Sequence, residues 1–306
     1  MNGLPDDWTL WDLLHWNPEH WSAAGVDLIV AVALMAALRF LAGVIGHVNS
    51  REELASRDNP AFGISLAAAV GAVAIMMSGA VTGEAGISLM DEVILVGAYG
   101  CLGVLLLAMA RFIFDRLTLP GIVIGAEIMR GNIAAALADA GNSLATAIIV
   151  RAVMTWVDSN SLAGLLAVLA GYLVSQIILS LATVLRLWIV ARLHVGTPLE
   201  KLLQEGNTAS AICFMGHRLG IALAVTAASG LVPYATDLLW VRVLAWGGVA
   251  MLLLVTLPVL ARLARMTILA GINMVEEIDE QRNIGVATID AAIYMGIGIL
   301  LAALLT

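Results

Sequence analysis

The sequence predicts an all-α membrane protein of eight transmembrane helices, arranged as four tandem helical hairpins. Of its 306 residues, 61% are apolar and 12% are charged, whereas soluble domains carry about 45–50% apolar and about 25% charged residues. An arginine followed 20 or 21 residues later by an asparagine occurs four times. Basic residues also gather around every second loop. Composition therefore indicates the class, and the repeat and the charges indicate the architecture.

The arginine–asparagine spacing defines an internal repeat. The four pairs are Arg39–Asn59, Arg111–Asn132, Arg186–Asn207 and Arg262–Asn283. The asparagines recur at intervals of 73, 75 and 76 residues, and this near-constant period predicts one structural unit used four times. The units are expected to be parallel repeats, related by rotation about the membrane normal. Two units make each half of the chain, residues 23–158 and residues 159–306.

Eight apolar runs have the length of a membrane span, which requires about 20 residues. They are residues 23–46, 60–82, 93–114, 132–157, 162–190, 208–232, 238–261 and 283–305. Helices are expected in all of them because lipid leaves backbone groups to be satisfied within each segment. The outgoing helices are rich in Leu and Val and the returning ones in Ala and Gly. Since small residues allow close helix packing in lipid, we expect the returning helices in the interior and the outgoing helices against lipid.

The basic residues predict the orientation. Twelve of the 15 Lys and Arg residues lie in or beside the first, third, fifth and seventh loops, and the alternate loops 83–92, 158–161 and 233–237 contain none. Because cytoplasmic loops carry an excess of basic residues, the basic loops are predicted to be cytoplasmic and both termini to face outside. The net charge of −8 then hides this asymmetry and does not mark an acidic surface for a basic partner.

Residues 1–22 form a tryptophan-rich leader. Trp8, Trp11, Trp16 and Trp21 lie among acidic residues, and indole rings favour the headgroup zone of a membrane. The leader is predicted to be a short extracytoplasmic interfacial helix on the outer leaflet, with a docking site for an envelope protein as the alternative. It lacks a basic n-region and a small-residue cleavage site, so it is not interpreted as a signal peptide.

Each basic loop is predicted to contain a short amphipathic connector at the inner membrane surface. Every connector has a glutamate five to seven residues before its asparagine: Glu52 and Glu53, Glu127, Glu200, and Glu276 and Glu277. The asparagine is suited to open the returning helix, because its amide oxygen accepts hydrogen bonds from the free N–H groups of the first turn. The four asparagines are therefore predicted helix caps.

Polar residues recur deep in the returning helices. They are Asp139 and Asp290, seven residues after an asparagine, and Asn142, His217, Arg218 and Tyr294, ten or eleven residues after one. Steps of three, four and seven residues share a helix face, so these side chains are predicted to form one stripe. At 1.5 Å per residue, the stripe lies roughly 10–16 Å from the helix start.

A charge at that depth costs about 2.5–3.5 kcal/mol or more, so it is expected to face the interior and to have a partner. Arg111 precedes Asp139 by 28 residues, and Arg262 precedes Asp290 by the same number. If each hairpin turns at its midpoint, the two residues of each pair lie at one depth on neighbouring antiparallel helices. We therefore predict the ion pairs Arg111–Asp139 and Arg262–Asp290.

Two interpretations of the polar residues stay open. In the first, they are structural ion pairs that lock the repeats together. In the second, the cluster is a pathway for a small ion or protons. The sequence has no HExxH or GxSxG motif, no phosphate-binding glycine loop and no metal-spaced Cys/His set. We therefore expect no enzyme, no metal site and no cofactor, and Cys101 and Cys213 are expected to be small packing residues.

Two segments resemble a known family. They are EIMRGNIAAALADAGNSLATAII and EEIDEQRNIGVATIDAAIYMGIGIL, in the second and fourth units. Their glutamate-bearing connector, asparagine and Ala-rich or Gly-rich continuation resemble the bacterial inner-membrane family catalogued as Domain of Unknown Function 350. The first unit departs most, because Pro60 follows its asparagine and Leu66 replaces the aspartate. The resemblance implies a multi-pass protein of the bacterial cytoplasmic membrane, carries over no activity, and implies work with membrane-stress proteins for some relatives.

Two functions are consistent with the sequence. The first is a channel or transporter-like protein that moves a small ion or protons between the returning helices. The second is a non-transporting scaffold whose connectors recruit a peripheral cytoplasmic protein. An open cavity reaching both aspartates would favour the first, and a packed interior with closed ion pairs would favour the second. We expect the lipid bilayer as the surroundings and no nucleic-acid partner, and a homo-oligomer remains open.

Overall fold

The computed structural model describes residues 18–46, 49–80, 89–157, 162–193, 196–235 and 237–305. Within these ranges the chain is helical and contains no strand. Seven helices are long and apolar enough to cross a membrane. They are Pro60–Ala80, Val93–Thr118, Ile133–Trp156, Gly164–Trp188, Thr208–Leu231, Leu239–Ile268 and Ile284–Leu305. These helices coincide with seven of the eight predicted spans and are compatible with a multi-pass membrane protein.

The remaining predicted span falls on α2 (Pro18–Gly46). Its apolar stretch among the described residues is Ala24–Leu38, which is shorter than a full span. The count of eight and the outward orientation of the termini therefore stay predictions. Residues 1–17 of the leader lie outside the described residues, and Trp21 already belongs to α2.

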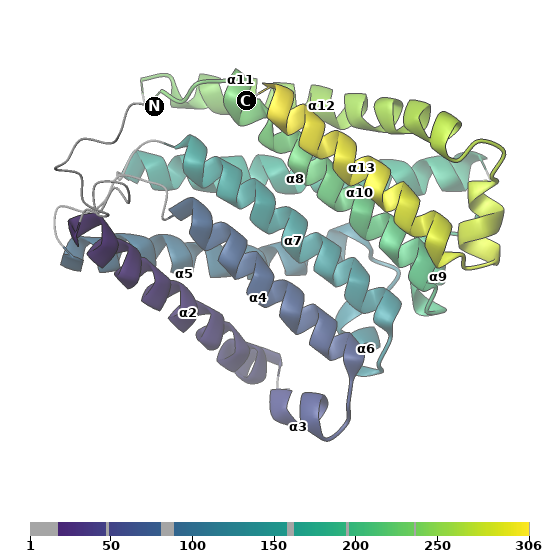
Figure 1. Ribbon diagram of the computed structural model, residues 1–306, viewed down its shortest axis with the longest axis horizontal. Coiled ribbons are helices and arrows are strands. Elements are labelled where there is room, and N and C mark those ends of the chain that lie inside the picture. Colours follow the sequence, from purple (N-terminus) through teal and green to yellow (C-terminus); the bar gives the residue numbers. More distant parts are fainter. Residues whose placement is uncertain are drawn as a thin grey trace, which may run out of the picture.

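Each unit consists of an outgoing helix, a short connector and a returning helix (Figure 1). The outgoing helices are α2, α5 (Leu89–Ile113), α8 (Leu162–Leu193) and α12 (Leu239–Ile268). The connectors contain α3 (Ser50–Ala55), α6 (Ile124–Met129), α9 (Leu199–Gln204) and the π-helical turn η2 (Glu276–Glu280). The returning helices are α4 (Pro60–Ala80), α7 (Ile133–Trp156), α10 (Thr208–Thr226) and α13 (Ile284–Leu305). A second π-helical turn, η1 (Phe114–Thr118), extends α5, and α11 (Ala228–Leu231) follows α10.

The returning helices lie side by side in one row, in the order α4, α7, α10, α13 (Figure 1). In the middle of the row, α7 and α10 bury 72% and 67% of their apolar windows, whereas α4 and α13 bury only 33% and 28%. The prediction that all returning helices form the interior is therefore right for the middle pair and wrong for the outer pair. The physical reason is that the row is open, so each outer helix has a single returning neighbour.

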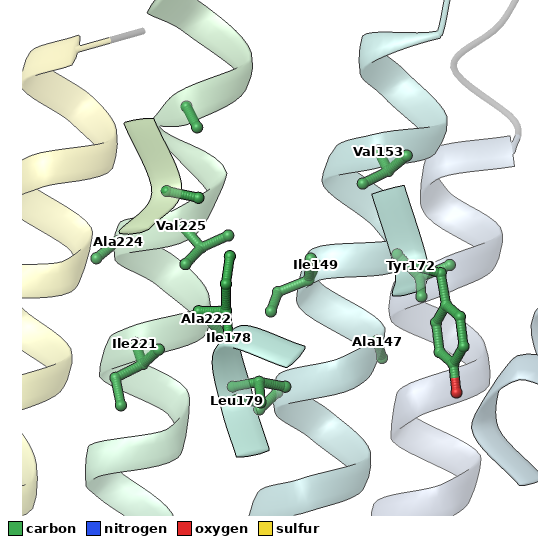
Figure 2. Packing of buried hydrophobic residues seen from close by; sticks show 14 of the residues in the cluster. Ala147, Ile149, Val153, Tyr172, Ile178, Leu179, Ile221, Ala222, Ala224 and Val225 are labelled. Atoms are coloured by element: carbon green, nitrogen blue, oxygen red, sulfur yellow. The ribbon is translucent and has the colours of Figure 1, made fainter. Parts of the chain in front are cut away.

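Apolar and small side chains hold the row together. Ile149, Ile178, Leu179 and Val225 bring α7, α8 and α10 into contact, as Figure 2 shows. Where α10 meets α13, a Cβ atom added at Gly216 or at Gly220 would overlap the backbone of α13. Such close approach maximises van der Waals contact, which replaces the hydrophobic effect as the attraction between helices in lipid.

All four asparagines cap their returning helices, as predicted. Each amide oxygen accepts a hydrogen bond from the N–H group three residues later, in Phe62, Ala135, Ser210 and Val286, at 3.0–3.2 Å. The residue before each asparagine has a positive φ: Asp58 (47°), Gly131 (83°), Gly206 (73°) and Arg282 (55°). One left-handed residue thus reverses the chain between connector and helix in every unit, although only two of the four are glycines.

The same asparagines tie neighbouring units together. The amide nitrogens of Asn59, Asn132 and Asn207 donate to the next connector, at the carbonyl oxygens of Ile128 (3.1 Å), Leu203 (2.8 Å) and Ile278 (2.9 Å). Three of the amide nitrogens also donate to a glutamate carboxylate of their own connector, at 2.7–3.1 Å. These bonds are Asn59–Glu53, Asn132–Glu127 and Asn283–Glu277. We call this series the asparagine ladder. The ladder explains why three of the connectors contain a glutamate before the asparagine. It also fixes the distances between the four neighbouring connectors.

The ladder predicts unequal effects of two equivalent substitutions. Asn132→Ala removes a cap and a bond to the next connector, whereas Asn283→Ala removes a cap without such a bond. Losing a cap costs about 0.5–2 kcal/mol, and the extra hydrogen bond adds about 1 kcal/mol. Unfolding of both variants in detergent by titration with sodium dodecyl sulfate measures the difference. Equal losses would contradict a contribution of the ladder to stability.

Candidate functional site

The first buried acid, Asp139, lies where α4, α5 and α7 meet. Its side chain is fully buried, and its Oδ2 accepts a hydrogen bond of 2.5 Å from the Ser65 hydroxyl of α4. The Nε of Arg111 lies 3.4 Å from its Oδ1. The predicted ion pair Arg111–Asp139 is therefore confirmed, and the helix α4 adds a neutral donor that the sequence reasoning missed.

The second buried acid, Asp290, lies where α10, α12 and α13 meet. Its Oδ2 is 2.7 Å from His217 Nε2 and 2.9 Å from Cys213 Sγ, and its Oδ1 is 3.3 Å from Arg265 Nη1. The predicted partner Arg262 is exposed, so the pair Arg262–Asp290 is wrong. Spacing fixes depth to within about one turn, or 5.4 Å. It does not decide which of two arginines three residues apart faces α13.

The histidine connects Asp290 to a further arginine. Arg186 of α8 donates from Nη1 to His217 Nδ1, at 2.9 Å. Since arginine has no acceptor, Nδ1 must accept this bond, and the ring proton is on Nε2, from which it is donated to Asp290. The ring of Tyr294 packs against His217 with centroids 3.8 Å apart and a tilt of 35°, and the guanidinium of Arg265 lies over the Tyr294 ring at 5.6 Å. Sequence reasoning had counted Arg186 only as a landmark of the repeat.

Arg218 lies between the two acids and contacts neither. It is 3% exposed and donates to the Asn142 Oδ1 at 2.6 Å and to the Thr183 hydroxyl at 3.0 Å. Its guanidinium carbon also lies 5.1 Å and 5.6 Å from the ring centroids of Phe114 and Phe214. Among the described residues, no carboxylate pairs with it. Neutral oxygens and aromatic rings therefore stabilise this cation in place of a counter-charge.

These contacts correct the prediction of a single polar stripe. At about 100° per residue, positions seven and eleven after the asparagine share one face, and positions six and ten lie on an adjacent face. Asp139, Arg218 and Asp290 occupy the first face, and Ser65, Asn142, Cys213 and His217 the second. Each bond joins the second face of one returning helix to the first face of the next. We call this series of lateral bonds the polar belt.

A cavity adjoins the partners of the first acid. Its volume is about 580 Å³, and its polar lining residues are Ser65, Arg111, Asp115 and Ser143 among mostly apolar side chains of α4, α5 and α6. Ser65 and Arg111 both contact Asp139. Asp290 does not line this cavity. This cavity therefore adjoins the partners of the first acid and does not reach the second, although the two acids are equivalent in the repeat.

Cys213, His217 and Asp290 also have the chemistry of metal ligands, and their ligand atoms lie within 4.8 Å of one another. However, Arg186 and Arg265 contact His217 and Asp290 directly. Two guanidinium groups at this distance oppose a cation electrostatically. The hydrogen bonds among the three residues are better explained as internal links of the polar belt.

The corrected pairing makes a direct prediction for α12. Arg265→Gln removes a charge-assisted contact to a buried carboxylate, which is worth about 1.5–3 kcal/mol. Arg262→Gln changes an exposed side chain and is expected to alter stability by at most about 0.5 kcal/mol. The free energies of unfolding of both variants in detergent check this. A greater loss for Arg262→Gln would restore the pairing predicted from spacing.

Comparison with known proteins places the chain in a family. A family model described as Domain of Unknown Function (DUF350) matches residues 14–154 and again residues 159–305. No curated protein and no solved structure matches the chain. The two matches follow one another in tandem and together cover nearly all of the sequence. The chain therefore belongs to the DUF350 family, as a tandem-repeat member.

Proposed function

We propose that the protein is a rigid membrane scaffold whose row of connectors recruits a peripheral cytoplasmic protein. The observation that carries this proposal is the asparagine ladder, in which the second, third and fourth connectors are each bonded to the unit before. The excess of basic residues around the connectors supports their placement on the cytoplasmic side. By its family, the proposed location is the bacterial inner membrane.

The connectors have the amphipathic character that such a role requires. Five of their apolar side chains are buried against the helices of the row: Ile124, Ile128, Leu199, Leu203 and Ile278. Several of their basic side chains are exposed, with 74% of the Arg130 side chain and 66% of the Lys201 side chain accessible. Apolar anchoring and polar presentation together favour a fixed surface for a soluble partner.

One acid ties the last connector to the unit before it. Asp279 of η2 accepts hydrogen bonds from the Thr197 backbone N–H at 3.2 Å and from the Ser210 hydroxyl at 3.5 Å. Burial raises the pKa of this carboxyl, and the two donors and Arg186 oppose that rise. The connector surface is thus coupled to the start of α10 by a partly buried acid.

The closed polar belt also favours a scaffold over a conduction pathway. Asp139 and Asp290 are both held by an arginine and by a donor from the neighbouring returning helix. Between them, the buried cation Arg218 opposes the passage of protons and other cations. The bonds between returning helices run along the row, which suits locking of the repeats.

The cavity favours a second candidate function, transport of a small ion or protons past Asp139. Ser65 and Arg111 line the cavity and contact this acid. A solute in the cavity could therefore compete for its partners. This candidate involves the first half of the chain, since the cavity does not reach Asp290.

Photo-crosslinking tests the scaffold. A benzophenone side chain at Arg130 or Lys201 is expected to give an adduct with a cytoplasmic protein in cells, because both positions are exposed on connectors. The matched control is Leu244 of α12, which is 72% exposed in an apolar span. The captured protein, once purified, should bind vesicles that contain the scaffold and not empty ones. Adducts of equal yield from Leu244, or none from the connectors, would contradict recruitment.

Flux measurements separate the two candidates. Reconstituted protein is expected to leave the proton and potassium permeability of vesicles at the level of protein-free vesicles, because the polar belt is closed. Asp139→Asn and Asp290→Asn should then change nothing in this assay. A flux that Asp139→Asn abolishes and Asp290→Asn spares would contradict the scaffold and support transport in the first half.

A further inference from the structure

The outer helix α13 has a face that resembles the faces through which the other returning helices pack on one another. In the three contacts between returning helices, one helix presents a leading face and the next a trailing face. The leading face contains the residues nine and thirteen positions after the asparagine, and the trailing face those at positions four, eight and fifteen. At α10 and α13, Gly216 of the leading face lies against Ala291 of the trailing face, and Gly220 lies against Gly298. At α7 and α10, Gly141 lies against Met215 in the same way.

The leading face is small in all four units. Its residue pairs are Ala68 and Ala72, Gly141 and Ala145, Gly216 and Gly220, and Ala292 and Gly296. The first three pairs are buried. On α13, in contrast, Ala292 is exposed, and a Cβ atom at Gly296 would meet nothing within 4 Å. α13 therefore keeps the small residues of the interface, and no helix among the described residues packs on them as α13 packs on α10.

At the other end of the row, the trailing face of α4, the first returning helix, is partly uncovered. Its residues in the four units are Gly63, Ala67 and Ala74; Ala136, Ala140 and Ala147; Ala211, Met215 and Ala222; and Ala287, Ala291 and Gly298. Small residues occupy every one of these positions except Met215. Ala67 and Ala74 are exposed on α4, although α2 also packs on this helix. Both ends of the row thus present one half of the interface that the chain already makes three times.

The side-chain amide of Asn283, at the start of α13, also indicates a place for a following unit. Asn59, Asn132 and Asn207 each donate to a carbonyl oxygen of the next connector. The amide nitrogen of Asn283 donates to Glu277, and no acceptor from a following unit exists in the described chain. Each accepting carbonyl belongs to the residue that follows the one bonded to the next asparagine's own backbone N–H. In the first unit that backbone bond goes to Glu53, so the equivalent carbonyl is that of Leu54. A second copy would supply it.

We propose that a second copy of this chain docks the trailing face of α4 on the leading face of α13. The contact between α7 and α10 is the precedent, because it joins the end of the first half to the start of the second. At the equivalent of the Ser65–Asp139 position, Ile289 of α13, which is 43% exposed, would meet Leu66 of the second copy. Such a head-to-tail interface uses two different surfaces, so it produces a ring or an open array.

Lipid acyl chains are less suited than another helix to cover these two faces. The outgoing helices present large side chains outward, such as Leu244 at 72% and Leu252 at 65% exposure on α12. Ala292 and Gly296 provide little apolar area to acyl chains, and small residues in a span favour close approach of another helix. The inference does not depend on the scaffold proposal, because it concerns how copies meet and not what they recruit.

Disulfide formation in membranes tests the register. In a Cys101→Ala background with the buried Cys213 retained, chains with Ala67→Cys and chains with Ala292→Cys are coexpressed. The contact of Gly216 with Ala291 places these two positions against each other, so a mixed dimer is expected after oxidation. Thr288→Cys, exposed on another face of α13, is the matched control and should give little product with Ala67→Cys. A dimer formed by Ala292→Cys chains alone, or equal yields for both positions, would overturn the head-to-tail arrangement.

A bulky substitution tests the interface without cysteines. Gly296→Leu is expected to weaken self-association in mild detergent at least about tenfold, which corresponds to about 1.4 kcal/mol. It should leave the thermal unfolding of the monomer unchanged, since nothing lies near Gly296 within the chain. Gly220→Leu, at the equivalent position of α10, should instead disrupt the monomer. Unchanged association of Gly296→Leu, or a monomer throughout for the parent chain, would overturn the proposal. Both readouts are independent of flux and recruitment.

Discussion

The fold depends on one side chain used four times. An asparagine amide has both an acceptor and two donors, and the chain uses both functions at once. The oxygen caps the helix that begins there in all four units, and in the first three units the nitrogen reaches the connector of the next unit. A serine or an aspartate could cap the helix as well, but neither could also donate two N–H bonds. The local requirement of helix initiation and the long-range requirement of register are thus met by the same residue.

The second constraint is the cost of charge inside a membrane. The chain meets it by bonding each deep polar group to a neighbouring returning helix, so that the helices cannot slide past one another without breaking a charge-assisted bond. Small residues set the distance between these helices, and the polar belt sets their register. Even Arg218, which has no acid partner among the described residues, contributes by joining α7 and α10 through Asn142.

Much of the architecture could be predicted because it is periodic. The recurrence of asparagine, seven of the spans, the helix caps and the pair Arg111–Asp139 all follow from spacing along the chain. Spacing could not distinguish Arg262 from Arg265, because both lie at similar depth and only the rotation of α12 decides which one faces Asp290. Nor could it show that the row of helices is open, since an open row and a closed ring of repeats have the same sequence period.

Other parts of the site were missed for a different physical reason. Ser65 and Cys213 are neutral and small, so nothing in their chemistry marks them among many similar residues. Their signal lay in position, because both stand six residues after an asparagine and the facing acids stand seven residues after the next one. A search for donors one position before each acid, in the preceding unit, would have found both.

The position of these donors shows how the chain is built. Units one and three supply a donor at position six, and units two and four supply the acid at position seven. The bonded unit is therefore a pair of hairpins, and the family model matches the chain twice. The contact between α7 and α10 has the same helix geometry but a different polar link, between Asn142 and Arg218. Small residues, which are common to all three contacts, thus determine that returning helices associate. The polar pairs, which differ, determine which helices are neighbours within a chain, and the outer faces of α4 and α13 keep only the shared part of this pattern.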